Sequence, residues 1–338
     1  MAGLLAICNR GAGGAQEEAV EAALGTLCEG ADVAEVSSTG ADRGDGAEEP
    51  DRRLDRALDA CPGRDVVVLG GDGSLHVVVA ALHRRGELGE RAVGLVPLGT
   101  GNDFARALGL PLDPERAARV VLAGHRRPMD LLVDDDGGIV VNAVHLGAGA
   151  EASERAAPLK PLLGRLAYPL GGLLAGVRSR GWRLRVTVDG RPLARGRRVL
   201  MAAVGNGVTI GGGTPLTPRA RPDDGMVDVV VAATTGPLAR AAYALRLRRG
   251  THLGLREVVM DRGREVTVSG GPVPVNADGE LTGPVTRRSW TVLPAAWQVF
   301  AEPGGQVAQA GAADRRPDRR SGEAPVPEAA GRRQGRDA

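Results

Sequence analysis

Short apolar runs alternate with segments of helical spacing over the first 130 residues. The apolar runs predict strands at Leu4–Cys8, Val33–Val36, Asp65–Leu69 and Ala92–Pro97. A helix is clearest over Gln16–Leu27, and the charged, Gly-rich stretch Thr39–Arg53 is expected to be a surface loop with a helix beginning near its end. Strands that alternate with helices favour βαβ units and a parallel sheet, which binds ligands at the carboxyl ends of its strands. The sequence therefore predicts an α/β domain over residues 1–130.

The pattern changes near Met129, where short strands separated by Gly, Asp and Pro turns begin. They are expected at Leu131–Val133, Ile139–Ala143, Arg183–Val188, Val199–Val204, Met226–Ala232, Arg264–Val268 and Trp290–Leu293. Ala157–Arg178 and Leu238–Arg249 have helical spacing instead. A mostly antiparallel, β-rich domain is therefore predicted over residues 131–301. Residues 302–338 are rich in Arg, acidic residues, Pro, Gly and Ala, with few large apolar side chains, which predicts a disordered tail.

Composition limits the class of protein further. Hydrophobic residues make up 43% and charged residues 25%, which is ordinary for a globular protein, and a net charge of +2 is too small to indicate a nucleic-acid partner. No uninterrupted apolar stretch reaches the roughly 18 residues of a membrane span. Met1–Ile7 lacks the basic flank and the length of a signal peptide. Cys8, Cys28 and Cys61 lack the spacing of metal ligands, so we expect a cytoplasmic, reducing compartment.

The loop Gly70-Gly-Asp-Gly-Ser74 directly follows an apolar strand. Glycines at such a position let the backbone turn sharply and bring its N–H groups against phosphate oxygens, helped by the N-terminus of the next helix. Asp72 would repel a phosphate unless a cation or a hydrogen-bond network accommodates its charge. A tight turn without a ligand is the alternative, so this loop alone does not decide between them.

A second strand ends in a loop of the same kind, Pro97–Ala105. Thr100 offers a hydroxyl to a phosphate or to metal-bound water. Asn102 and Asp103 could cap the following helix, which is a purely structural role. Asn9–Gly13 is a third loop at a strand end. Because the carboxyl ends of parallel strands share one edge of a sheet, three such loops favour a nucleotide crevice over simple turns.

Together these motifs resemble those of the diacylglycerol kinase catalytic-domain family, which includes bacterial lipid kinases and is related to sphingosine kinases. The N-terminal motifs are Asn9-Arg-Gly-Ala-Gly13, Gly70–Ser74 and Pro97–Asp103. Those of the second domain are Asn142–Gly149, Gly205-Asn-Gly with Gly211-Gly-Gly213, Asp223-Asp-Gly-Met-Val-Asp228 and Asp278-Gly-Glu280. Each motif alone is weak evidence, but all of them occur in the family's order over residues 4–300.

The resemblance implies a fold, a reaction and cofactors. The fold is a Rossmann-like, NAD-kinase-like nucleotide domain followed by a β-rich sandwich domain. The reaction is an ATP- and Mg²⁺-dependent transfer of the γ-phosphate to a lipid hydroxyl, with diacylglycerol as the best single substrate and phosphatidic acid as its product. Since the chain carries no Walker A Gly-Lys-Ser/Thr motif, backbone N–H groups and arginines would bind the phosphates.

The resemblance also implies site residues. The ATP contacts would be Asn9, Arg10, Gly11, Ala12, Gly13, Thr39, Gly70, Gly71, Asp72, Gly73, Ser74, Leu75, His76 and Thr100. Glu280 matches the general base that accepts the proton of the lipid hydroxyl, although from the residues alone it is a solvated turn carboxylate. Asp224 matches a magnesium ligand, with backbone carbonyls from Arg221 and Met226, and oxygen ligands suit a hard cation. A plain hairpin turn is the alternative at Asp224.

Three positions depart from the family pattern. Arg10 replaces the usual proline of the first loop and adds charge near the phosphates. Ser74 replaces threonine and keeps the hydroxyl. His76 stands where asparagine or a similar polar residue is common, and we interpret it as a substitution on the helix face rather than a catalytic histidine.

Two segments have the character of a membrane contact. Pro158–Val177 is apolar with a basic edge, and Leu238–Arg249 places Leu238, Ala241, Ala242 and Leu245 near one helical side with arginines elsewhere. Amphipathic basic helices bind anionic membranes, but such helices also pack on a sheet with their arginines solvated, and for Leu238–Arg249 this packing is slightly favoured. The expected partners are a membrane lipid and, peripherally, the inner face of the cell membrane, with no nucleic acid; a homodimer is left open.

Two other functions stay open. The first is a soluble-substrate kinase of the NAD-kinase or phosphofructokinase type, which also uses Gly-Gly-Asp-Gly; the order of Asp223–Asp228 and Asp278–Glu280 counts against it. The second is a non-catalytic regulator that binds lipid or nucleotide. The presence of both Asp72 and Glu280 counts against that function.

Overall fold

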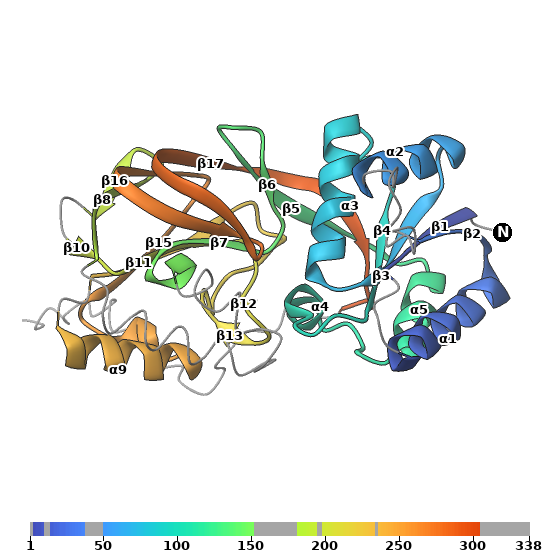
Figure 1. Ribbon diagram of the computed structural model, residues 1–338, viewed down its shortest axis with the longest axis horizontal. Coiled ribbons are helices and arrows are strands. Elements are labelled where there is room, and N and C mark those ends of the chain that lie inside the picture. The colour runs from blue at the N-terminus through green and yellow to red at the C-terminus, as the bar shows by residue number, and fades with distance from the viewer. Residues whose placement is uncertain are drawn as a thin grey trace, which may run out of the picture.

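The computed structural model describes residues 3–9, 14–37, 50–151, 181–194, 198–233 and 236–304 (Figure 1). Arg10–Gly13, Thr39, the predicted helix Ala157–Arg178 and the predicted tail beyond residue 304 lie outside the described residues. The described chain forms an α/β part and a β-rich part, drawn side by side in Figure 1.

The N-terminal part is built on the parallel sheet that the strand–helix alternation predicts. Its strands, in the spatial order β2-β1-β3-β4, are β2 (Asp32–Ser37), β1 (Gly3–Cys8), β3 (Asp65–Gly70) and β4 (Val93–Pro97), and each neighbouring pair is parallel. All residues of β3 and β4 are buried, because helices cover both faces of such a sheet and its strands must be apolar on both sides.

Helices cover both faces of this sheet (Figure 1). Side chains of α1 (Gly14–Gly30) and α5 (Pro114–Leu122) share one apolar cluster with Leu4, Val67 and Val96. Side chains of α2 (Pro50–Ala60), α3 (Asp72–Arg85) and α4 (Asp103–Leu108) share a second cluster with the opposite face. The sequence analysis did not predict α5. Its start could have been read from the sequence, because Asp113 followed by Pro114 is a typical beginning of a helix. In the structure Asp113 caps this helix by accepting a hydrogen bond from Arg116 N.

The second part is antiparallel, as predicted. Its strands follow the order β15-β14-β11-β7-β16-β17, with β8 beside β16. They are β7 (Ala143–Gly147), β8 (Trp182–Val188), β9 (Arg191–Ala194), β10 (Arg198–Val199), β11 (Met201–Gly205), β14 (Val227–Ala232), β15 (Val258–Gly263), β16 (Glu265–Ala277) and β17 (Glu280–Phe300). The remaining elements are the hairpin β12 (Thr209–Ile210) and β13 (Thr214–Pro215), helix α9 (Pro237–Arg248) and the short 3₁₀ helix η3 (His252–Gly254).

Two strands join the two parts. The first half of β17 pairs with β16, and the strand continues beside β5 (Arg126–Asp134) until Val299 pairs in parallel with Val93 of β4. β5 also pairs with the short strand β6 (Ile139–Val140). The predicted domain boundary at residue 130 therefore falls inside a strand, and the last residues of β17 extend the N-terminal sheet. The sequence pattern at Trp290–Leu293 showed only a small portion of this long strand.

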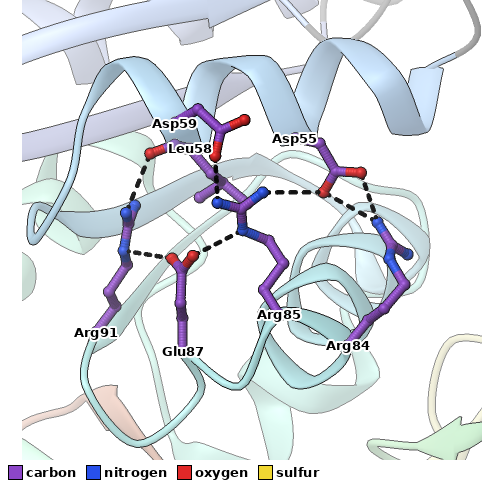
Figure 2. Close-up of polar contacts among 7 residues, drawn as sticks. All are labelled: Asp55, Leu58, Asp59, Arg84, Arg85, Glu87 and Arg91. Carbon is purple, nitrogen blue, oxygen red and sulfur yellow. Dashed lines mark hydrogen bonds and ion pairs between the residues drawn. The ribbon is translucent and has the colours of Figure 1, made fainter.

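An ion-pair network ties α2 to the end of α3, as Figure 2 shows. Arg91 donates to the carbonyl of Leu58 at 3.1 Å, and this carbonyl lies in the last turn of α2, where helices leave carbonyls without internal partners. Arg91 Nε also lies 2.9 Å from Glu87 Oε2, and Glu87 Oε1 accepts from Arg85 at 2.7 Å. Arg91 is only 4% exposed, so its guanidinium depends on these partners.

Candidate active site

A cavity of about 550 Å³ opens where the carboxyl ends of β3 and β4 meet the second part of the chain. The N-terminal part lines it with the two Gly-rich loops and with Leu75 and Phe104. The β-rich part lines it with Val141–Ala143 and His145, with Ile210–Gly212, and with Asn276, Asp278 and Gly279. The cavity therefore brings together residues from five of the seven predicted motifs, Asn142–Gly149 and Asp278–Glu280 among them.

The two Gly-rich loops touch each other through their backbones. A Cβ atom added to Gly99 would lie 2.5 Å from Gly71 Cα, so neither position has room for a side chain. Asn102 holds the second loop: its amide oxygen accepts from Gly99 N at 2.9 Å and its amide nitrogen donates to Gly99 O at 2.8 Å. Asn102 has a φ of 52°, a left-handed conformation that asparagine tolerates better than most residues. The loops thus form one rigid backbone surface at the edge of the sheet.

The carboxylate of Asp72, which would repel a phosphate, is occupied by hydrogen bonds within the protein. Its two oxygens accept the backbone N–H groups of Asp103 and Phe104, each at 3.0 Å, at the start of α4. Burial raises the pKa of Asp72, and these two hydrogen bonds partly oppose that rise. The carboxylate is therefore used inside the protein to hold α4 against the first Gly-rich loop.

The side chains of Asn102 and Asp103 do not cap α4. Asn102 occupies the N-cap position but makes no side-chain capping bond, and Asp72 supplies that bond instead. The carboxylate of Asp103 points to the other part of the chain, where it accepts from Thr209 Oγ1 and Gly213 N at 2.7 Å and from Gly212 N at 2.8 Å. Asp103 thus fixes the β12–β13 turn over the cavity, a role that spacing along the chain could not reveal.

The first loop reaches the second through Asn9. Asn9 Nδ2 donates to Ser74 Oγ at 3.1 Å, and Asn9 N donates to Leu69 O at 3.0 Å. The hydroxyl that Ser74 keeps in place of threonine is therefore used to join the two loops. Of the predicted ATP contacts within the described residues, the structure places Asn9 and Gly70–His76 in one continuous group, with Thr100 in the cavity wall beside them.

The turn Asp278-Gly-Glu280 forms the opposite wall. Asp278 accepts backbone N–H groups from Val141 at 2.6 Å, Asn142 at 2.9 Å and Ala143 at 3.0 Å. These N–H groups lie at the break between β6 and β7, which explains why the predicted strand Ile139–Ala143 is divided in two. A carboxylate with three backbone donors is held firmly, so the turn that carries Glu280 has one position relative to the cavity.

Glu280 is the first residue of β17 and its side chain is exposed to solvent. It follows Gly279, which lines the cavity, and its charge contributes to the raised pKa of His76. An exposed carboxylate next to a closed backbone surface can accept a proton from a hydroxyl that enters from solvent. This position is compatible with the predicted role of general base, which stays a prediction.

His76 contacts this turn across the cavity. Its Nδ1 lies 2.9 Å from Asp278 Oδ2, and its side chain is 15% exposed. Burial disfavours the charged ring, but the hydrogen bond to Asp278 and the charges of Asp278 and Glu280 outweigh it, so the pKa of His76 is raised. The interpretation of His76 as a mere substitution on the helix face missed this contact, because its partner is far away in the sequence.

The predicted metal residues lie away from the cavity wall. The carboxylate of Asp224 forms an ion pair with Arg262 and accepts from Met226 N at 3.2 Å, while Arg221 Nε lies 3.4 Å from Asp223. Within the described ranges, no group of three or more His, Cys, Asp or Glu side chains could hold a metal ion. One carboxylate engaged by a guanidinium does not by itself provide the oxygen ligands that Mg²⁺ needs. The assignment of Arg221, Asp224 and Met226 to a cation stays a prediction.

His145 lines the cavity as a buried, uncharged ring. Burial lowers its pKa to about 4, and within the described residues its Nδ1 has no hydrogen-bond partner. A histidine that titrates at 6.5 when unfolded favours the folded state above that pH, and this stability is lost as the pH falls toward 4. As the pH falls from 6.5 to about 4, we expect protonation of His145 to lower the free energy of unfolding by about 3 kcal/mol.

Urea unfolding at pH 7 and pH 5 measures this contribution. His145→Gln should show a smaller loss of stability than the native protein between the two pH values, because glutamine does not titrate. His125→Gln, at an exposed position, is the matched control and should keep the native pH dependence. Equal pH dependence in the native protein and His145→Gln would contradict the prediction.

Comparisons with known proteins agree with this architecture. The diacylglycerol kinase catalytic domain matches residues 3–133, and the YegS C-terminal NAD kinase beta sandwich-like domain matches residues 142–301. A crystal structure of a diacylglycerol kinase from Bacillus anthracis str. Sterne superposes with a TM-score of 0.70 at 20% identity, covering 89% of this chain and 97% of that one. This likeness confirms the fold.

Relatives named "Probable lipid kinase YegS-like" match the sequence directly. The protein from Stenotrophomonas maltophilia (strain K279a) is 34% identical over 241 residues, which is 68% of this chain and 76% of the relative. The protein from Pseudomonas aeruginosa is 38% identical over 175 residues, which is 50% of this chain and 54% of the relative. Fold, cavity and relatives together define a lipid kinase. The chain belongs to the YegS-like branch of the diacylglycerol kinase family.

Proposed function

We propose that the protein transfers the γ-phosphate of ATP, bound as its magnesium complex, to the hydroxyl of diacylglycerol. The observation that supports this most strongly is the cavity in which the Gly-rich loops of one part face the Asp278–Glu280 turn of the other. The loops offer backbone N–H groups to phosphates, and the turn offers a carboxylate to a hydroxyl. A kinase needs these two surfaces in alignment and little further covalent chemistry from the protein.

In the proposed reaction, the lipid hydroxyl approaches the γ-phosphate from the side of Glu280. The Glu280 carboxylate accepts the hydroxyl proton while the oxygen forms a bond to the γ-phosphorus. The bond between that phosphorus and the β–γ bridging oxygen breaks, and ADP leaves with the electron pair. The contact of His76 with Asp278 and the hydrogen bonds of Asp103 with the β12–β13 turn connect the two surfaces across the cavity. The fixed position is what lowers the entropic part of the barrier.

Transfer of label from γ-labelled ATP tests the proposed function. The protein is incubated with Mg²⁺ and mixed micelles of extracted lipids, and the products are separated by polarity and identified by mass. We expect label in phosphatidic acid. Label in a different phospholipid would keep the lipid kinase and replace diacylglycerol as acceptor. A parallel incubation contains NAD or a sugar phosphate besides the micelles. Label only in these water-soluble acceptors would overturn the proposal and support a soluble-substrate kinase.

Within this reaction we expect His76 to position the turn that carries Glu280. His76→Leu removes the donor to Asp278 and should lower turnover about tenfold, as the loss of one hydrogen bond of about 1.4 kcal/mol predicts. His76→Asn keeps a short polar donor and should recover part of the loss. Turnover at saturating ATP and lipid is the measurement. Equal turnover in His76→Leu and the native protein would remove His76 from the mechanism.

A further inference from the structure

Helix α9 packs on the β-rich part through a single strongly buried side chain, Tyr243. Tyr243 is 4% exposed and meets the buried ring of His252 edge-on, with 5.8 Å between the ring centroids. His252 Nε2 lies 3.0 Å from Leu216 O, so the ring that receives Tyr243 is itself held in place. These contacts determine which side of α9 faces the protein.

The leucines of α9 lie away from the protein. Leu238 is 86% exposed and Leu245 is 56% exposed, and Leu238 is the most exposed large apolar side chain of the described residues. The two are separated by about two helical turns, so they occupy the same face of the helix. The sequence analysis slightly favoured packing of this apolar side on the sheet, and the exposure of both leucines counts against that.

Positive charge gathers at the end of α9 beside Leu245. The segment Gly236–Arg256 contains five arginines and no acidic residue. Arg246, Arg248 and Arg249 are exposed, and Arg248 and Arg249 follow Leu245 by three and four residues, which places them next to it on the helix surface. We name Leu238, Leu245, Arg246, Arg248 and Arg249 the α9 face. Two exposed leucines bordered by arginines match an anionic lipid surface in both polarity and charge.

Helix α9 is connected to the wall of the cavity through the β12–β13 hairpin. Helix α9 contacts β13, and the paired strand β12 leads into Ile210–Gly212, which line the cavity. Figure 1 shows α9, the β12–β13 hairpin and α4 along the same side of the molecule. A bilayer in contact with α9 would therefore lie on the side of the molecule that carries the β12–β13 hairpin.

We propose that the α9 face docks the protein on an anionic lipid bilayer, with Leu238 and Leu245 between the acyl chains and Arg246, Arg248 and Arg249 at the headgroups. The biological purpose of this surface rests on the proposed function, since a kinase of membrane lipids must reach its substrate at the bilayer. The docking itself depends only on the exposed side chains. In the part of the chain that the structure describes, no helix is both long and apolar enough to span a membrane, so the contact proposed is peripheral.

Co-sedimentation of the full chain with lipid vesicles tests this surface. The vesicles contain phosphatidylcholine alone or phosphatidylcholine with phosphatidylglycerol, and the protein should bind the second kind more tightly, less so at high salt. Arg246→Gln, Arg248→Gln and Arg249→Gln combined should weaken binding about 10²-fold. Leu238→Ser with Leu245→Ser should weaken it at least about tenfold. Leu112→Ser is the matched control, at a leucine 40% exposed in the N-terminal part, and should bind as the native chain does.

Three measurements separate the outcomes. Native vesicle binding by both sets of variants would overturn the proposal. Variants that bind vesicles less tightly, but that also have a lower Tm or a changed oligomeric state in the absence of lipid, would overturn it too. Such a result would mean that residues 152–180 or a second copy of the chain cover the α9 face. Activity on substrate in detergent micelles tests the active site separately: the variants should equal the native protein there. A native protein inactive on micelles that still binds vesicles through α9 would reject the proposed function but keep the docking surface.

Discussion

Replacement of Glu280 by glutamine is expected to lower turnover roughly 10²-fold or more while ATP binding stays unchanged. Glutamine has nearly the same shape as glutamate but cannot accept the proton of the lipid hydroxyl. The turn should keep its position, because Asp278 and not Glu280 is hydrogen-bonded to Val141–Ala143. Turnover at saturating substrates and the Kd for ATP, measured on the same preparation, check both halves of the prediction.

Glu265→Gln is the matched control for this variant. Glu265 is an exposed carboxylate at the first residue of β16, as Glu280 is at the first residue of β17, and it does not line the cavity. It should retain native turnover. A Glu280→Gln variant with native turnover would exclude Glu280 as the base. A variant that loses ATP binding as well would show that Glu280 acts on nucleotide binding rather than on proton transfer.

Replacement of Arg91 by methionine is expected to lower the free energy of unfolding by about 3 kcal/mol. The variant keeps most of the side-chain volume but removes the guanidinium that meets Leu58 O and Glu87 (Figure 2). The carbonyl of Leu58 then loses one of its two donors and keeps Cys61 N, and Glu87, which is 20% exposed, keeps only the ion pair with Arg85. Urea unfolding at pH 7 measures the loss. Turnover of the folded variant should be unchanged, because Arg91 does not line the cavity.

Arg84→Met separates burial from charge in the same network. Arg84 pairs with Asp55 at 3.0 Å, but its side chain is 52% exposed. A solvent-exposed ion pair is expected to contribute less than about 1 kcal/mol, because water screens the charges and the long side chain loses entropy on pairing. Equal losses for Arg84→Met and Arg91→Met would show that burial of the guanidinium is not the source of the stability.

Much of the fold could be predicted from the sequence because it depends on local patterns. The apolar runs at Leu4–Cys8, Asp65–Leu69 and Ala92–Pro97 became buried parallel strands, since a strand covered on both faces must be apolar throughout. The helix predicted over Leu238–Arg249 appears as α9. The length of β17 could not be predicted, because exposed polar residues in its first half hide the alternation that marks a strand.

The order of the motifs identified the family, and the turn chemistry of Gly70–Gly73 indicated the nucleotide side of the site. These features are readable along the chain, since a glycine-rich turn between a strand and a helix has the same local geometry in any sheet. The roles of Asp72 and Asp103 were not readable. Asp72 binds the start of α4, which follows a different strand of the same sheet. Asp103 binds the β12–β13 turn, which becomes its neighbour only when the two parts of the chain meet.

The sequence by itself determined the parallel α/β sheet and the antiparallel second domain, and it predicted the residues to which the chemistry is assigned. Only the tertiary structure decided that Asp278 is anchored by Val141–Ala143, that His76 reaches this anchor from α3, and that Leu238 and Leu245 lie in solvent. The physical reason is the range of the forces involved. Strand and helix patterns arise from neighbouring residues, whereas a hydrogen bond across a cavity or an exposed helix face depends on which surfaces the whole chain brings together.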